Sequence, residues 1–148
     1  MQLNNQVALI TGGASGLGLA TAKSLQSQGL RIAVLDYDQA SLERVSLEHG
    51  FVTHACDVAD AQAVELACQK VVKEYGAIHI NVNCAGIAPA ARVVSREGVQ
   101  PLSAFEKVIQ VNLLGTFNVL RVVAGMMMQQ DPVDNSDERG VIINTASV

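Results

Sequence analysis

Short apolar runs alternate with amphipathic segments from one end of the chain to the other. The apolar runs predict buried strands at 7–11, 31–36, 51–56, 78–84 and 141–144. The segments between them have apolar residues at helical spacing and predict helices at 16–28, 39–49, 61–75 and 104–130. This alternation is typical of a parallel sheet covered by helices. We find no repeat or linker, and we expect one α/β domain over residues 1–148.

Individual residues mark the ends of these helices. Gly29, Gly50 and Gly76 each follow an expected helix, as glycine commonly does at a helix C-terminus. Asp60 and Ser103 are expected as N-caps, because their side-chain oxygens can accept hydrogen bonds from the first unpaired N–H groups. Residues 87–102 form an expected loop of unusual length for a compact domain.

The connections between the strands predict the order of the sheet. Right-handed crossovers with helices on both faces favour the doubly wound order 3-2-1-4-5, which reverses between the first and fourth strands. Ligands bind at such a reversal, beyond the carboxyl ends of the strands. Two glycine-bearing strand ends, 12–18 and 85–86, are expected to meet in that crevice.

Composition and charge exclude several classes of function. The chain is globular in composition, with 49% hydrophobic and 16% charged residues, and its formal net charge of −4 argues against nucleic acid as a partner. No apolar run approaches the roughly 20 residues of a membrane span, and there is no secretory signal, so we expect a cytoplasmic protein. The three cysteines and three histidines lack metal-ligand spacing, and no metal site is expected.

The most informative stretch is 11–18, Thr-Gly-Gly-Ala-Ser-Gly-Leu-Gly, between the first strand and the first helix. The first N–H groups of a helix are unpaired and its dipole favours an anion, while glycines let a phosphate approach the backbone. The spacing is neither G-x-G-x-x-G nor a P-loop, because Thr21 and Leu19 occupy the diagnostic positions. An unrelated glycine turn stays open as the alternative.

Asp36 makes a dinucleotide the preferred ligand of this turn. It ends the second strand about 20 residues further on, where a carboxylate can accept hydrogen bonds from both ribose hydroxyls of an adenosine. The same carboxylate repels a 2′-phosphate, and Tyr37 and Asp38 supply no arginine to bind one. We therefore expect NAD as the cofactor and not NADP. A solvated turn aspartate is the alternative.

Six motifs, taken together and in order, resemble those of the short-chain dehydrogenase/reductase family. They are the glycine turn 11–18, Asp36, Asp57-Val58, Asn83-Cys84-Ala85-Gly86, Asn112 and Asn144-Thr145-Ala146-Ser147. Within the family, the sequence most resembles the type 10 17β-hydroxysteroid dehydrogenases, also called type 2 3-hydroxyacyl-CoA dehydrogenases. The resemblance implies a Rossmann-like fold and a homotetramer with the helix 104–130 in one interface.

The resemblance also implies roles for individual residues. Those expected to bind the cofactor are Gly12, Ser15, Gly16, Leu17, Gly18, Asp36, Asp57, Val58, Cys84 and Gly86. The first five would hold the pyrophosphate, Asp36 the adenosine ribose, Asp57 and Val58 the adenine, and the last two the nicotinamide side. Ser147 matches the catalytic serine, and Asn112 matches the asparagine that supports a proton-relay water. Without the resemblance to the family, we would interpret Ser147 as a turn serine and Asn112 as a helix-interior asparagine.

One part of the family's machinery is missing from the sequence. The chemistry needs a tyrosine as general acid/base and a lysine one helical turn later, both beyond the serine, but only one residue follows Ser147. Tyr37 and Tyr75 lack such a lysine, and neither is expected near the crevice. We expect the N-terminal portion of a longer enzyme, without the family's last strands, so that the strand 141–144 forms an exposed edge.

The expected function is that of an NAD-dependent oxidoreductase that converts a secondary alcohol into a ketone. The small-molecule substrate would be a 3-hydroxyacyl-CoA or another hydroxylated lipid. Two alternatives stay open. A 3-oxoacyl carrier-protein reductase would usually prefer NADPH, against which Asp36 counts, and a non-catalytic NAD-binding fragment would need no Tyr-x-x-x-Lys motif.

Overall fold

A parallel sheet forms the centre of the molecule. The computed structural model describes residues 4–89, 91–96, 98–133 and 137–146. Its sheet strands are β1 (Val7–Thr11), β2 (Arg31–Asp36), β3 (Val52–Ala55), β4 (Ile80–Asn83) and β7 (Val141–Asn144). In this described part of the chain they pair in the parallel order β3-β2-β1-β4-β7. The predicted order 3-2-1-4-5 is therefore confirmed, with β7 as the fifth strand.

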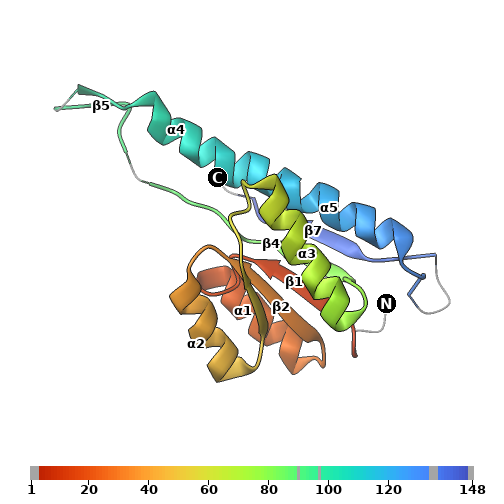
Figure 1. Ribbon diagram of the computed structural model, residues 1–148. Coiled ribbons are helices and arrows are strands. Elements are labelled where there is room, and N and C mark those ends of the chain that lie inside the picture. Colours follow the sequence, from red (N-terminus) through yellow and green to blue (C-terminus); the bar gives the residue numbers. More distant parts are fainter. Residues whose placement is uncertain (1–3, 90, 97, 134–136, 147–148) are drawn as a thin grey trace.

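Helices cover both faces of the sheet (Figure 1). Successive strand residues point to opposite faces, so Val7 and Leu9 pack with α3 (Ala61–Tyr75) and α5 (Thr116–Gln129), whereas Ala8 and Ile10 pack with α1 (Gly16–Ser27) and α2 (Gln39–His49). β1 lies in the middle, and all five of its residues are buried. The fold is thus Rossmann-like and doubly wound, as the alternating pattern predicts.

The helix ends agree with the predicted signals in all but one case. The Asp60 carboxylate caps α3 by accepting hydrogen bonds from the N–H groups of Gln62 and Ala63, at 2.9 and 3.0 Å. Gly50 and Gly76 follow α2 and α3 with positive φ angles of 70° and 88°. The prediction that Ser103 is an N-cap is wrong. The helix α4 (Leu102–Ile109) already begins after Pro101, whose ring fixes φ at a helix-compatible value.

The predicted helix 104–130 is not one regular α-helix. A π-helical segment, η1 (Gln110–Gly115), separates α4 from α5. At the start of α5, the Thr116 hydroxyl donates to the carbonyl oxygen of Asn112 in η1 at 2.7 Å. The preceding loop contains a short antiparallel hairpin of β5 (Val94–Ser95) and β6 (Gly98–Val99). A wider helical turn and two-residue strands leave no clear periodicity, so the sequence did not reveal them.

Two apolar parts of the structure are exposed: the edge strand β7 and much of the helical stretch Leu102–Gln129. β7 lies at the sheet edge, where Val141 and Ile143 are 41% and 49% exposed, which confirms the predicted apolar edge. Among the described residues, Leu102–Gln129 is the one helical stretch long and apolar enough to cross a membrane by length and composition. Charged residues interrupt this stretch, so it does not form one continuous apolar run in the sequence. Core helices of soluble proteins can have the same length and composition.

Candidate functional site

A cavity of about 590 Å³ lies at the carboxyl ends of the central strands. It is bordered by the residues that follow β1, β2, β3 and β4, and so contains the point where the strand order reverses. Its volume is within the range typical of small-molecule sites. All ten residues predicted to bind a cofactor line it: Gly12, Ser15, Gly16, Leu17, Gly18, Asp36, Asp57, Val58, Cys84 and Gly86.

The glycine turn forms one wall of the cavity. Gly12 has a φ of 65°, and a Cβ atom there would lie 2.8 Å from the backbone nitrogen of Ala85, so the turn packs against the end of β4 without space for a side chain. Ser15 is the N-cap of α1 but makes no side-chain capping bond, and its exposed side chain lines the cavity. The first residues of α1 therefore border the cavity with their unpaired N–H groups.

The Asp36 carboxylate is held in place at the end of β2. One oxygen accepts a hydrogen bond from the Ala14 N–H at 3.1 Å, and the other accepts from the Asp38 N–H at 3.2 Å. Each carboxylate oxygen has a second lone pair and can accept a further bond. Tyr37, 80% exposed, also lines the cavity, so the prediction that neither tyrosine lies near the crevice is wrong for this one.

A chain of polar side chains, with Thr11 and Asn83 buried and Asn144 exposed, connects β1, β4 and β7 at their carboxyl ends. The Thr11 hydroxyl accepts hydrogen bonds from the Cys84 and Ala85 N–H groups and donates to Asn83 Oδ1, at 3.2, 3.2 and 3.4 Å. Asn83 Nδ2 in turn donates to Asn144 Oδ1 at 2.8 Å. These bonds join the carboxyl ends of β1, β4 and β7. They fix the spacing between the glycine turn and the Cys84–Gly86 wall.

The cysteines on the cavity are not activated thiols. Burial raises the pKa of Cys84, which is half-buried, and burial with the nearby Asp57 and Asp60 carboxylates raises the pKa of Cys56 to about 11. Both thiols therefore stay protonated at neutral pH. The described residues hold no cluster of potential metal ligands.

Of the two residues predicted as catalytic, the structure describes Asn112 but not Ser147. Asn112, in η1, does not line the cavity directly. Its Oδ1 accepts from the Ile87 N–H and its Nδ2 donates to the Ile87 carbonyl oxygen, both at 2.9 Å, and Ile87 does line the cavity. Asn112 thus holds one wall of the cavity in place. Ser147 lies outside the described residues.

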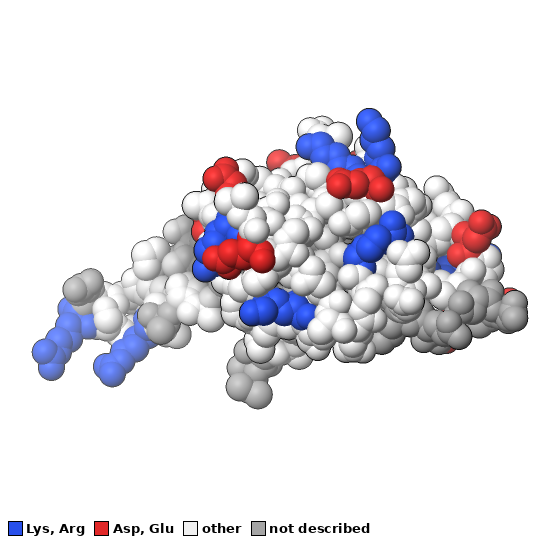
Figure 2. All heavy atoms as spheres, turned by 90° about the horizontal axis from the view of Figure 1, so that it is seen from below, with Lys and Arg blue, Asp and Glu red and all other residues white. Residues whose placement is uncertain are grey.

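One charged residue of the site, Lys107, was not among the residues predicted from the sequence. Lys107 lines the cavity together with Val111, which lies one helical turn later across the junction of α4 and η1. The spacing of four residues between them could have indicated a shared face, but not that this face borders the cavity. The wider surface mixes charges of both signs: on the face in Figure 2, acidic and basic side chains are interspersed among uncharged ones.

A doubly wound parallel sheet, with a glycine turn and a cavity at the reversal of its strand order, defines a Rossmann-like α/β protein. Comparison with protein families refines this class. The family model described as short chain dehydrogenase matches residues 6–148. The chain therefore belongs to the short-chain dehydrogenase family of oxidoreductases.

Individual relatives are matched over almost the whole of this chain. The 3-hydroxyacyl-CoA dehydrogenase type-2 of Rattus norvegicus is 45% identical, over 96% of this chain and 56% of that protein. The D-threitol dehydrogenase of Mycolicibacterium smegmatis is 35% identical, over 99% and 54%. A solved structure of NAD⁺-bound xylitol dehydrogenase superposes with a TM-score of 0.83 at 33% identity, over 99% and 55%. The chain spans about half the length of the relatives it matches.

Proposed function

We propose that this chain forms the NAD-binding part of an oxidoreductase that converts a secondary alcohol into a ketone. The observation that carries the proposal is the single cavity that collects the glycine turn, Asp36, the Asp57-Val58 pair and the Cys84–Gly86 wall. These residues come from four different strand ends. Membership of the family and the NAD⁺-bound xylitol dehydrogenase structure support the same cofactor class.

The residues present fit a dinucleotide. A Cβ atom at Gly16 would meet nothing within 4 Å, so the backbone at the start of α1 is open to a ligand, and its unpaired N–H groups suit a pyrophosphate. The fixed Asp36 carboxylate can accept from ribose hydroxyls, and Asp57 and Val58 would border the adenine. When bound, NAD would supply the hydride acceptor of the reaction.

The choice of NAD over NADP rests on Asp36. A 2′-phosphate would place negative charge against this carboxylate, which both backbone bonds hold at the cavity. The Nη2 group of Arg44 donates to the Ala14 carbonyl oxygen at 3.0 Å, and Arg44 is not among the residues that line the cavity. A 3-oxoacyl carrier-protein reductase, which would use NADPH, is therefore the less favoured proposal.

The finer parts of the proposal come from the family relatives. The proposed substrate is a 3-hydroxyacyl-CoA or a similar hydroxylated lipid, with Ser147 and Asn112 as catalytic residues of a cytoplasmic enzyme. The proposed assembly is a homo-oligomer. It is supported by the apolar side chains exposed along α4, η1 and α5, among them Phe105, Leu114 and Phe117.

Calorimetric titration and a turnover assay together test this function. We expect saturable binding of one NAD per chain and, for the enzyme that includes a Tyr-x-x-x-Lys segment, NAD reduction on addition of a 3-hydroxyacyl-CoA. NAD binding without turnover by that enzyme would favour the non-catalytic NAD-binding alternative. Stronger binding of NADPH, with reduction of a 3-oxoacyl carrier protein, would favour the reductase. Absence of any dinucleotide binding would contradict the proposal.

A further inference from the structure

The turn after β3 is stabilised by its own hydrogen bonds. Asp57 Oδ1 accepts from the Ala59 N–H at 2.9 Å, and the Asp57 carbonyl oxygen accepts from the Asp60 N–H at 3.0 Å. Asp60 then caps α3. These bonds fix the turn relative to α3. They leave the carbonyl oxygen of Val58, in the middle of the turn, to be paired by another element.

Two residues of the long helical layer hold Val58 from the other side. Asn118 of α5 is only 8% exposed, and its Nδ2 donates to the Val58 carbonyl oxygen at 2.8 Å. Gly115, three residues earlier on the same face, lies so close that a Cβ atom there would be 2.5 Å from Val58 Cγ2. The backbone and the side chain of Val58 are therefore both held by a single turn of helix.

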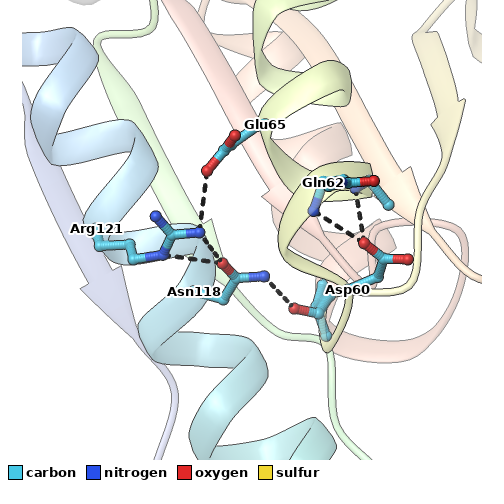
Figure 3. A network of polar contacts seen from close by, with 7 residues as sticks. Asp60, Gln62, Glu65, Asn118 and Arg121 are labelled. Atoms are coloured by element: carbon cyan, nitrogen blue, oxygen red, sulfur yellow. Dashed lines mark hydrogen bonds and ion pairs between the residues drawn. The ribbon is translucent and has the colours of Figure 1, made fainter.

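The orientation of the Asn118 amide is itself fixed by Arg121 of the same helix. Its Oδ1 accepts two hydrogen bonds from Arg121, from Nε at 3.1 Å and from Nη2 at 2.8 Å. The same Nη2 contacts Glu65 Oε1 of α3 at 3.2 Å (Figure 3). With two donors at Oδ1, the amide must direct its own N–H group toward Val58. The network thus connects α5, α3 and the cavity wall.

We propose that Asn118, oriented by Arg121, is a positioning residue that sets Val58 and Asp57 for recognition of the adenine base. The inference rests on the proposed NAD-binding function and adds to it the residues that determine base preference. Asn118 does not line the cavity and acts through the Val58 carbonyl oxygen. Asp57 could accept a hydrogen bond from the exocyclic amino group of adenine, which hypoxanthine lacks, only if the turn holds its position.

The test compares two probes, NAD and nicotinamide hypoxanthine dinucleotide, by calorimetric titration of the full chain. The wild-type protein is expected to prefer NAD. Asn118→Asp replaces the amide donor with a carboxylate facing the Val58 carbonyl oxygen. We expect this variant to bind NAD roughly ten-fold more weakly and to bring the ratio of its affinities for the two probes close to one. Arg121→Ala truncates a half-exposed side chain and should act in the same direction by roughly three-fold.

Two control variants distinguish a positioning role of Asn118 from a general effect on the stability of the protein. Glu65→Gln keeps an acceptor for Arg121 and should leave the probe preference unchanged, because a surface ion pair contributes little. Lys73→Ala removes an exposed cation from the last turn of α3, distant from Val58, and should also leave it unchanged. If Asn118→Asp does not fold, Arg121→Ala decides alone.

The outcomes distinguish this inference from the proposed function. A wild-type protein that binds neither probe would overturn the proposed function and the inference with it. A wild-type protein that binds both probes equally, or folded variants that keep the wild-type preference, would overturn the inference while NAD binding stands. Variants that lower only the melting temperature would likewise show a purely structural role.

Discussion

A Cβ atom at Gly18 would lie 2.1 Å from the carbonyl oxygen of Gly12. The first and last glycines of the turn are therefore in direct backbone contact, and the turn closes on itself at the start of α1. Gly18 is also buried, with the Gly13 Cα atom at 3.0 Å from the same position. This contact, and not only conformational freedom, explains why glycine is needed at position 18.

Gly18→Ala is accordingly expected to destabilise the protein. The added methyl group must displace backbone atoms, and overpacking of this kind costs about 1–3 kcal/mol in the free energy of unfolding. Gly125→Ala is the matched control, because a Cβ atom at this helical position meets nothing within 4 Å. That control should stabilise α5 by about 0.5–1 kcal/mol. Urea unfolding of both variants measures the difference, and equal effects would contradict the packing argument.

Asn112 is expected to control the protection of the Ile87 amide. Asn112→Ala removes both side-chain bonds to Ile87, each worth about 1 kcal/mol, and should open the cavity wall locally. Asn112→Asp keeps an acceptor for the Ile87 N–H but places a carboxylate oxygen against the Ile87 carbonyl oxygen, to which the amide donated. Hydrogen exchange at Ile87 should therefore be fastest in the alanine variant and intermediate between it and the wild type in the aspartate variant. Identical exchange in all three proteins would show that the bonds do not hold this wall.

His79 is expected to make the protein less stable in mild acid. Its Nδ1 accepts a hydrogen bond from the Val7 N–H at 3.1 Å, and burial, with Arg31 nearby, lowers its pKa. As the pH falls from the unfolded-state pKa of about 6.5 toward the lower folded-state value, the unfolded chain binds more protons and the free energy of unfolding decreases.

Thermal unfolding between neutral and mildly acidic pH measures this effect in the wild type and in His79→Asn. The variant should lose part of the pH dependence. The remainder is expected from His54, whose pKa is also lowered, mainly by burial and further by Lys70. An unchanged or steeper dependence in the variant would contradict the assignment.

Local signals in the sequence were sufficient for most of the fold and much of the site. Apolar runs located the strands, Asp60 gave the start of α3, and the motifs at the strand ends placed ten residues on one cavity. A parallel sheet brings its carboxyl ends together, so residues that follow successive strands become neighbours without further information. The order of the six motifs along the chain agrees with its membership of the short-chain dehydrogenase family.

Contacts between distant elements could not be read from the sequence. Lys107 reaches the cavity only because the end of α4 borders it, and Asn118 matters because α5 packs against the turn at Val58. Asn112, in the π-helical segment, likewise bonds to Ile87, which is 25 residues away. No periodicity encodes these relationships, since each depends on how two separate segments pack.

The proposed NAD site is tested most directly by the affinity of this protein for NAD relative to NADP, measured in the wild type and in Asp36→Asn. The variant keeps an oxygen that can accept from the Ala14 N–H but removes the charge that repels a 2′-phosphate. We expect the wild type to bind NAD at least roughly ten-fold more tightly than NADP, and the variant to lose most of that preference. Equal affinities for NAD and NADP in the wild type, or an unchanged preference for NAD in Asp36→Asn, would contradict the assignment of this cavity as an NAD site whose preference Asp36 determines.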